Sequence, residues 1–164
     1  MPEITLFGWF HTVVGVFALL AGFYTLARYR LIKSSQRSGG LYLILTIIAA
    51  ASALGIYKHG GFGIAHALAV LTLLAVLVGF VAEKKRLFGG LSRYIQAASY
   101  SATLLFHMIP AVTDGLMRLP VGSPMVTDFA DPLLQGSHLA LLIAYIVGLS
   151  LQAIMLRRGG DEQG

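Results

Sequence analysis

The sequence predicts an all-α integral membrane protein, a helical bundle with five transmembrane helices in one transmembrane domain, residues 1–164. Hydrophobic residues make up 57% of the chain and charged residues only 12%, whereas soluble domains carry about 25% charged residues. The charges also stand in short clusters between five apolar runs. Each run approaches the roughly 20 residues that a helix needs to cross the hydrocarbon core.

The expected spans cover residues 4–27, 41–57, 62–82, 94–109 and 133–156. The second and fourth are short, and we expect flanking Gly, Ser, Tyr or Lys residues at the interface to complete them. We do not expect the first span to be a cleaved signal peptide, because no basic residue precedes it and it exceeds a typical signal-peptide core. Alanine and serine are dense in the second span, which predicts close helix packing.

The connections between the spans differ in length and composition. Residues 28–40 and 83–93 form short, basic turns that contain glycine, which is typical of links between antiparallel helices. The long connection is the outer loop 110–132, where Pro120 is one of the residues that prevent a continuous helix. Asp131 followed by Pro132 predicts the N-cap and first turn of the last helix.

The basic residues predict the orientation of the bundle. With an external N-terminus and a cytoplasmic C-terminus, ten of the twelve Lys and Arg residues lie on the inner side, as the positive-inside rule requires. Only Lys58 and Arg118 remain outside. We therefore expect a multi-pass protein of the bacterial cytoplasmic (inner) membrane, whose basic residues face anionic lipid and not nucleic acid. The chain has no cysteine, which excludes disulfides and iron–sulfur clusters.

Four histidines, His11, His66, His107 and His138, fall inside the expected spans. A titratable ring within a membrane helix is costly and commonly marks a functional site. Counting 1.5 Å per residue from the inner charged flanks places all four in the outer third of the bilayer, in a band of about 8 Å. The sequence therefore predicts a shared site, although each histidine alone also fits a simple interhelical hydrogen bond.

Haem b is the cofactor that these histidines favour most, because two imidazoles from facing helices serve as axial ligands. We expect His66 and His138 to be the ligands, with His11 and His107 as the next pair. Arg118, the only arginine in the outer loop, would face the propionates. Small residues that would leave room for the macrocycle are Gly15, Ala18, Ala67 and Ala140.

Two other kinds of site use the same histidines. Three or four of them would bind zinc, copper or iron, with Asp114 or Asp128 entering from the outer loop. A proton or quinone path is the other, because polar stripes share helix faces with His107 and His138. The members of these stripes are Gln96, Tyr100 and Thr103 in the fourth span and Tyr145 and Gln152 in the fifth.

Three segments carry a resemblance to a known family: FHTVVGVFALLAGF (10–23), RSGGLYLILTIIAAASAL (37–54) and GFGIAHALAVL (61–71). They resemble a family of small, uncharacterised bacterial multi-span inner-membrane proteins, which implies a multi-span helical fold. Histidines on facing helices of a small bundle are also similar in plan to small bacterial membrane cytochromes b. The chain departs from that plan by placing every intramembrane histidine on the outer side, so it has room for one outer haem at most.

The leading functional hypothesis is a membrane-embedded b-type haem protein that transfers electrons near the outer leaflet, with quinone as its partner. A histidine-ligated metal site of a membrane enzyme or transporter is the chief alternative. The remaining alternative is a structural subunit of a respiratory or photosynthetic complex, which binds no cofactor and packs against other membrane subunits.

The distribution of basic residues generates a topology prediction. Reporter fusions after Arg37, Arg86 and Arg158 should be active on the cytoplasmic side, whereas fusions near Gly61 and Gly122 should be active outside the cell. Paired phosphatase and fluorescent-protein reporters measure this directly. A cytoplasmic signal from Gly122 would invert the orientation and move every histidine to the inner half.

Overall fold

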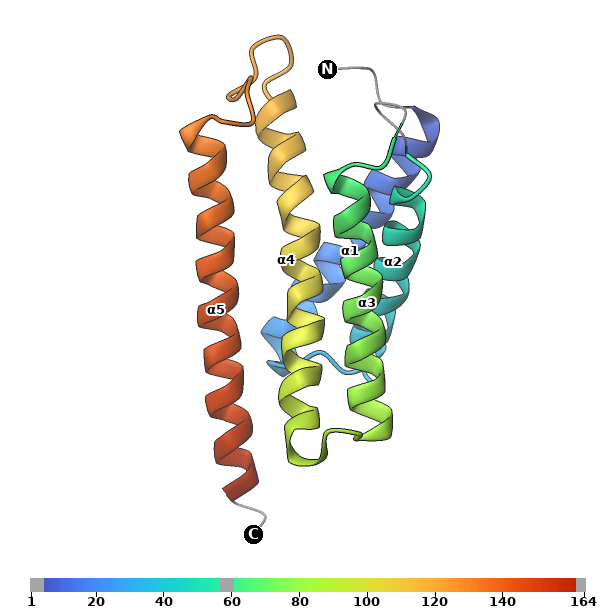
Figure 1. The fold of residues 1–164 in the computed structure, drawn as a ribbon, viewed down its shortest axis with the longest axis vertical. Coiled ribbons are helices and arrows are strands. Elements are labelled where there is room, and N and C mark those ends of the chain that lie inside the picture. The colour runs from blue at the N-terminus through green and yellow to red at the C-terminus, as the bar shows by residue number, and fades with distance from the viewer. Residues whose placement is uncertain (1–4, 57–60, 162–164) are drawn as a thin grey trace.

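The fold, taken from a computed structural model that describes residues 5–56 and 61–161, is helical throughout the described chain (Figure 1). Five long helices follow in order, with one short 3₁₀ turn between the third and fourth. Their bounds are α1 Leu6–Tyr29, α2 Arg37–Ala53, α3 Ile64–Lys85, η1 Gly89–Leu91, α4 Ser92–Arg118 and α5 Pro132–Asp161. The expected number and order of helices are therefore confirmed in the described chain.

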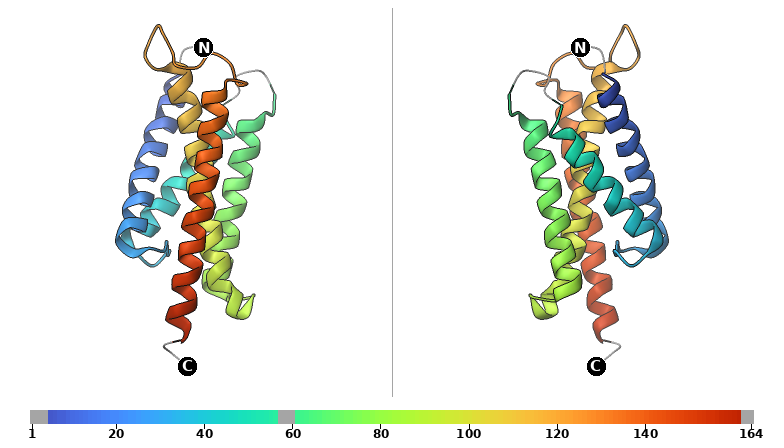
Figure 2. Two further views of the ribbon diagram at one scale, coloured as in Figure 1. Left: turned by 90° about the vertical axis from the view of Figure 1, so that its left-hand side faces the viewer. Right: turned by 90° about the vertical axis from the view of Figure 1, so that its right-hand side faces the viewer.

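The helices run up and down the long axis, and each connects to the next at one end (Figure 1). The end that carries residues 119–131 is called the loop end here, and the end that carries residues 30–36 and 86–91 is called the basic end. α4 packs against both α3 and α5, while α1 pairs with α2 and α2 contacts α3. Figure 2 shows α5 along one side of the bundle, where it packs against α4 and leaves most of its surface exposed.

Three helices, α1, α3 and α5, are long and apolar enough to cross a membrane. α2 is a shorter apolar helix of 17 residues. α2 is shifted from the expected span 41–57, because it begins at Arg37 and ends at Ala53. Residues 4, 57 and 58 lie outside the described part of the chain.

α4 differs from the expectation at its loop end. The sequence pattern ended this span at residue 109 and began the outer loop at Pro110, but the helix continues through Pro110 to Arg118. A salt bridge between Arg118 Nε and Asp114 Oδ2, 3.3 Å apart, supports the added turns. The loop therefore covers residues 119–131. The expected start of α5 is confirmed, because Asp131 Oδ1 accepts a hydrogen bond from Leu133 N at 2.8 Å.

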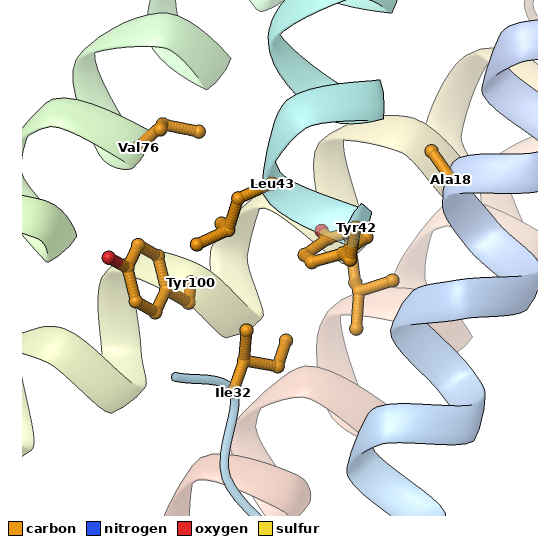
Figure 3. Close-up of a cluster of buried hydrophobic side chains, with 7 residues drawn as sticks. Ala18, Ile32, Tyr42, Leu43, Val76 and Tyr100 are labelled. Carbon is orange, nitrogen blue, oxygen red and sulfur yellow. The ribbon is translucent and has the colours of Figure 1, made fainter. Parts of the chain in front are cut away.

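The packing inverts the pattern of a soluble protein. Large apolar side chains such as Phe17, Leu74 and Ile143 cover the outside, each about half exposed. The interior instead holds alanines, threonines and the two fully buried tyrosines Tyr42 and Tyr100 (Figure 3). Small and polar residues at helix contacts with apolar residues outside are typical of helices that pack in lipid.

Two glycines make the room that the buried tyrosines need. A Cβ on Gly22 of α1 would lie 2.9 Å from the Tyr42 ring, and one on Gly79 of α3 would lie 2.5 Å from the Tyr100 ring. Both separations are shorter than van der Waals contact, so only glycine lets these helices approach.

Gly79→Ala should therefore lower the stability of the protein in detergent by about 1–3 kcal/mol, the usual cost of overpacking. Thermal unfolding followed by circular dichroism measures the change. Gly148→Ala in α5 is the matched control, because its Cβ would meet nothing within 4 Å. If the two variants unfold at the same temperature, Gly79 is not needed for the contact with Tyr100.

Candidate functional site

His11 of α1 and His107 of α4 converge on one side of α2. His11 Nδ1 lies 3.0 Å from both the carbonyl oxygen of Ala49 and the hydroxyl of Ser52. His107 Nε2 lies 3.3 Å from the hydroxyl of Thr46. Thr46 and Ala49 are three residues apart, so they lie on the same helix face. His11 and His107 form what we call the histidine pair.

The contacts of His11 define its tautomer. The Ser52 hydroxyl donates its hydrogen to the Ala49 carbonyl at 2.9 Å, so both oxygens near His11 Nδ1 act as acceptors toward the ring. His11 Nδ1 therefore carries the hydrogen, and the lone pair of the neutral ring lies on Nε2. A backbone carbonyl that holds Nδ1–H in this way orients Nε2 for a metal ion or a proton.

The other two histidines lie elsewhere. His66 is buried at the start of α3, where its Nδ1 accepts a hydrogen bond from Gly63 N at 3.1 Å. Its ring stacks on that of Phe62, with 5.3 Å between the ring centroids. His138 of α5 faces Thr113 of α4, with 2.9 Å between Nε2 and the hydroxyl. α4 packs between α3 and α5 (Figure 1). The structure thus does not bring His66 and His138 together, although the sequence favoured them as a pair.

The loop residues that the sequence linked to the site are also engaged elsewhere. Asp114 pairs with Arg118 on the last turns of α4, and Asp128 Oδ1 accepts a hydrogen bond from Ala130 N at 3.0 Å. Across residues 5–56 and 61–161, no three histidine or acidic side chains come close enough to share a metal ion. The expected cluster of three or four histidine ligands is not formed there.

Much of the expected polar path holds the helices together. Gln96 Nε2 donates to the carbonyl of Ile32 at 3.0 Å, and Gln152 Nε2 donates to that of Arg30 at 2.9 Å. Tyr145 OH donates to the carbonyl of Ala98 at 3.2 Å. Gln96 and Gln152 therefore bind the connection that follows α1, and Tyr145 binds α5 to α4.

Tyr100 and Thr103 do belong to a buried polar network, together with residues that the sequence reading missed. The Thr103 hydroxyl donates to the Tyr100 carbonyl at 2.7 Å and so accepts from Tyr42 OH. Thr46, which contacts His107, lies one turn along α2 from Tyr42. Tyr42, Thr46 and Ala49 share one face of α2 at spacings of four and three, a signal hidden by the apolar residues around it.

Glu83 is a further residue that the sequence reading missed. Its carboxylate accepts hydrogen bonds from Tyr100 OH at 2.9 Å and from the backbone N–H of Ser34, at 3.1 and 3.0 Å to its two oxygens. Its side chain is only 11% exposed, and Lys84 Nζ lies 3.9 Å away. Glu83 joins α3, α4 and the connection that follows α1 at the basic end.

Comparison with protein-family models, with curated proteins and with solved structures found no match for the chain.

Glu83→Ala should lower the stability by about 2–3 kcal/mol, because hydrogen bonds to charged groups contribute about 1.5–3 kcal/mol and the variant leaves Ser34 N–H without its acceptor. Thermal unfolding in detergent measures the loss. Lys84→Ala is the control, because Lys84 is 44% exposed and its ion pair at 3.9 Å contributes little. Equal effects of the two variants would show that Glu83 does not hold the connection.

Proposed function

We propose that the chain is an electron-transfer protein of the bacterial cytoplasmic membrane, with the histidine pair His11 and His107 as the axial ligands of one b-type haem. The observation that carries the proposal is the convergence of these two imidazoles, from α1 and α4, on one side of α2. The proposal keeps the cofactor class that the sequence favours and changes the pair of ligands.

The membrane placement rests on three apolar helices and on the apolar outer surface of the bundle. We extend the spans to α2 and α4 because both run alongside the other three (Figure 1). α2 has 17 residues, and at 1.5 Å per residue it is about 26 Å long, close to the thickness of the hydrocarbon core. We place the basic end in the cytoplasm, since it carries most of the lysines and arginines.

The surroundings of the pair suit a flat macrocycle. A Cβ on Gly15, one turn from His11, would meet nothing within 4 Å, so this stretch of α1 has open space beside it. α1 and α4 touch only lightly, whereas α1 packs closely on α2. Ala67 and Ala140 face outward and do not line this region. When bound, haem supplies a one-electron redox centre.

The residues of the chain would orient and tune that centre. The Ala49 carbonyl and the Ser52 hydroxyl hold the His11 ring and orient its Nε2. Thr46 positions His107, and the buried hydroxyls of Tyr42 and Thr103 extend from it toward the basic end. Quinone is the partner that we propose, because its carbonyls accept hydrogen bonds near the membrane surface.

A structural membrane subunit without a cofactor is the second candidate function. Its specific support is α5, which contacts α4 along one side and exposes large apolar residues along the rest. Neighbouring helices of a larger complex would cover this surface. The hydrogen bonds of His11, His107 and His138 would then serve only to hold helices together, and that of His66 would only cap the start of α3.

Visible absorption of the protein purified from haem-supplemented cells tests the proposal. We expect a Soret band that shifts on reduction and that is lost or strongly altered in His11→Ala and in His107→Ala. His66→Ala and His138→Ala are matched controls, which should keep the band and lose about 1 kcal/mol of stability at most. A featureless spectrum in the wild type would overturn the haem proposal, and metal analysis would then separate a bound ion from the cofactor-free subunit.

A further inference from the structure

A groove of about 310 Å³ runs between α4 and α5 near the basic end, and its lining is apolar. The residues that line it are Tyr94, Ile95, Ala97 and Ala98 from α4 and Leu149, Ala153 and Leu156 from α5. We call it the α4–α5 groove. Its volume falls at the lower end of the range of about 300–1,000 Å³ that is typical of ligand sites.

Side-chain size and two hydrogen bonds explain why the groove stays open. Three of the lining residues are alanines, so the helices present little bulk to each other there. Tyr145 OH donates to the Ala98 carbonyl, and Ser101 Oγ donates to Gln152 Oε1 at 3.0 Å. These bonds hold α4 and α5 together beside the groove, so its shape is set by fixed helices and not by a mobile segment.

Arginines stand at the end of the groove nearest the basic end. The guanidinium of Arg93 lies over the ring of Tyr94, 5.4 Å from its centroid, and Tyr94 lines the groove. On α5, Arg157 follows Ala153 by four residues and therefore continues the same helix face. Arg158 is adjacent, and both are exposed. An apolar groove with arginine residues at the same end of both helices matches one kind of ligand, a hydrocarbon chain with an anionic head.

We propose that the α4–α5 groove binds an anionic phospholipid, with one acyl chain in the groove and the phosphate at Arg93, Arg157 and Arg158. Guanidinium groups bind phosphate through paired, charge-assisted hydrogen bonds, and basic sites between membrane helices select anionic head groups. The inference rests on the membrane placement of the proposed function and is independent of the histidine pair and of haem.

Lipid binding to the delipidated full chain in a neutral detergent tests the proposal. Phosphatidylglycerol and phosphatidylcholine with identical acyl chains are added in turn, and bound lipid is counted by native mass spectrometry. We expect phosphatidylglycerol to bind at least tenfold more tightly and to raise the unfolding temperature, while inorganic phosphate alone does neither. Equal binding of the two lipids to the wild type would overturn the proposal without bearing on the histidine pair.

Two variants and one control locate the site. The triple variant Arg93→Gln, Arg157→Gln, Arg158→Gln should weaken phosphatidylglycerol binding by roughly fivefold for each charge removed. The control removes the same charge from α3 and the residue after it, with Lys84→Gln, Lys85→Gln and Arg86→Gln, and should keep wild-type affinity. Ala153→Leu fills the groove and should also weaken phosphatidylglycerol binding, with circular dichroism confirming the fold. If the control variant binds phosphatidylglycerol as weakly as the triple variant does, net charge and not the groove attracts the lipid.

Discussion

The rest of the bundle depends on how the connection between α1 and α2 is held at the basic end. Ile32 in this connection is only 2% exposed, so its backbone polar groups cannot all reach water. Three side chains meet this demand: Glu83 accepts from Ser34 N–H, Gln96 donates to the Ile32 carbonyl, and Gln152 donates to the Arg30 carbonyl. They come from α3, α4 and α5, so one short segment ties all the later helices to the first two. In a low-dielectric interior each of these bonds would be costly to lose.

The two buried tyrosines, Tyr42 and Tyr100, lie next to that connection along the bundle. Tyr100 reaches Glu83 through its hydroxyl and fills the space left by Gly79, while Tyr42 reaches Thr103 and fills the space left by Gly22. Each large side chain thus has a glycine opposite its ring and a polar partner at its tip. This arrangement is typical of helices that pack in lipid, because lipid solvates leucine as well as a protein interior does and burying leucine there gains little. The interior of small and polar residues and the apolar exterior follow from the same constraint.

The sequence was sufficient to predict the helices, because apolar runs alternate with basic turns and the capping pair Asp131–Pro132 has a local cause. It was not sufficient at Pro110, where a proline inside the run was read as an end although α4 continues eight residues further. For the site, depth along each helix could be counted, but depth does not give direction around the axis. His66 and His138 share the expected depth with His11 and His107 and still face different partners. The sequence did not predict the roles of Thr46, Ser52 and Glu83. The role of a hydroxyl or of an acid at a helix end depends on which side chain or backbone group of another segment lies beside it.

The buried titratable groups of the described chain lie in particular helices, which limits the positions where chemistry can occur. α1 to α4 contain the histidine pair toward the loop end and the carboxylate of Glu83 at the basic end, with the hydroxyls of Tyr42 and Thr103 between them. These hydroxyls do not form one continuous chain, because Thr103 donates to the carbonyl of Tyr100, whereas it is the hydroxyl of Tyr100 that donates to Glu83. The Thr103 hydroxyl already donates to the Tyr100 carbonyl, so a proton that passes through it requires this bond to break first. The electron transfer proposed for the histidine pair would need no such rearrangement, which is the physical reason for proposing redox chemistry ahead of proton conduction.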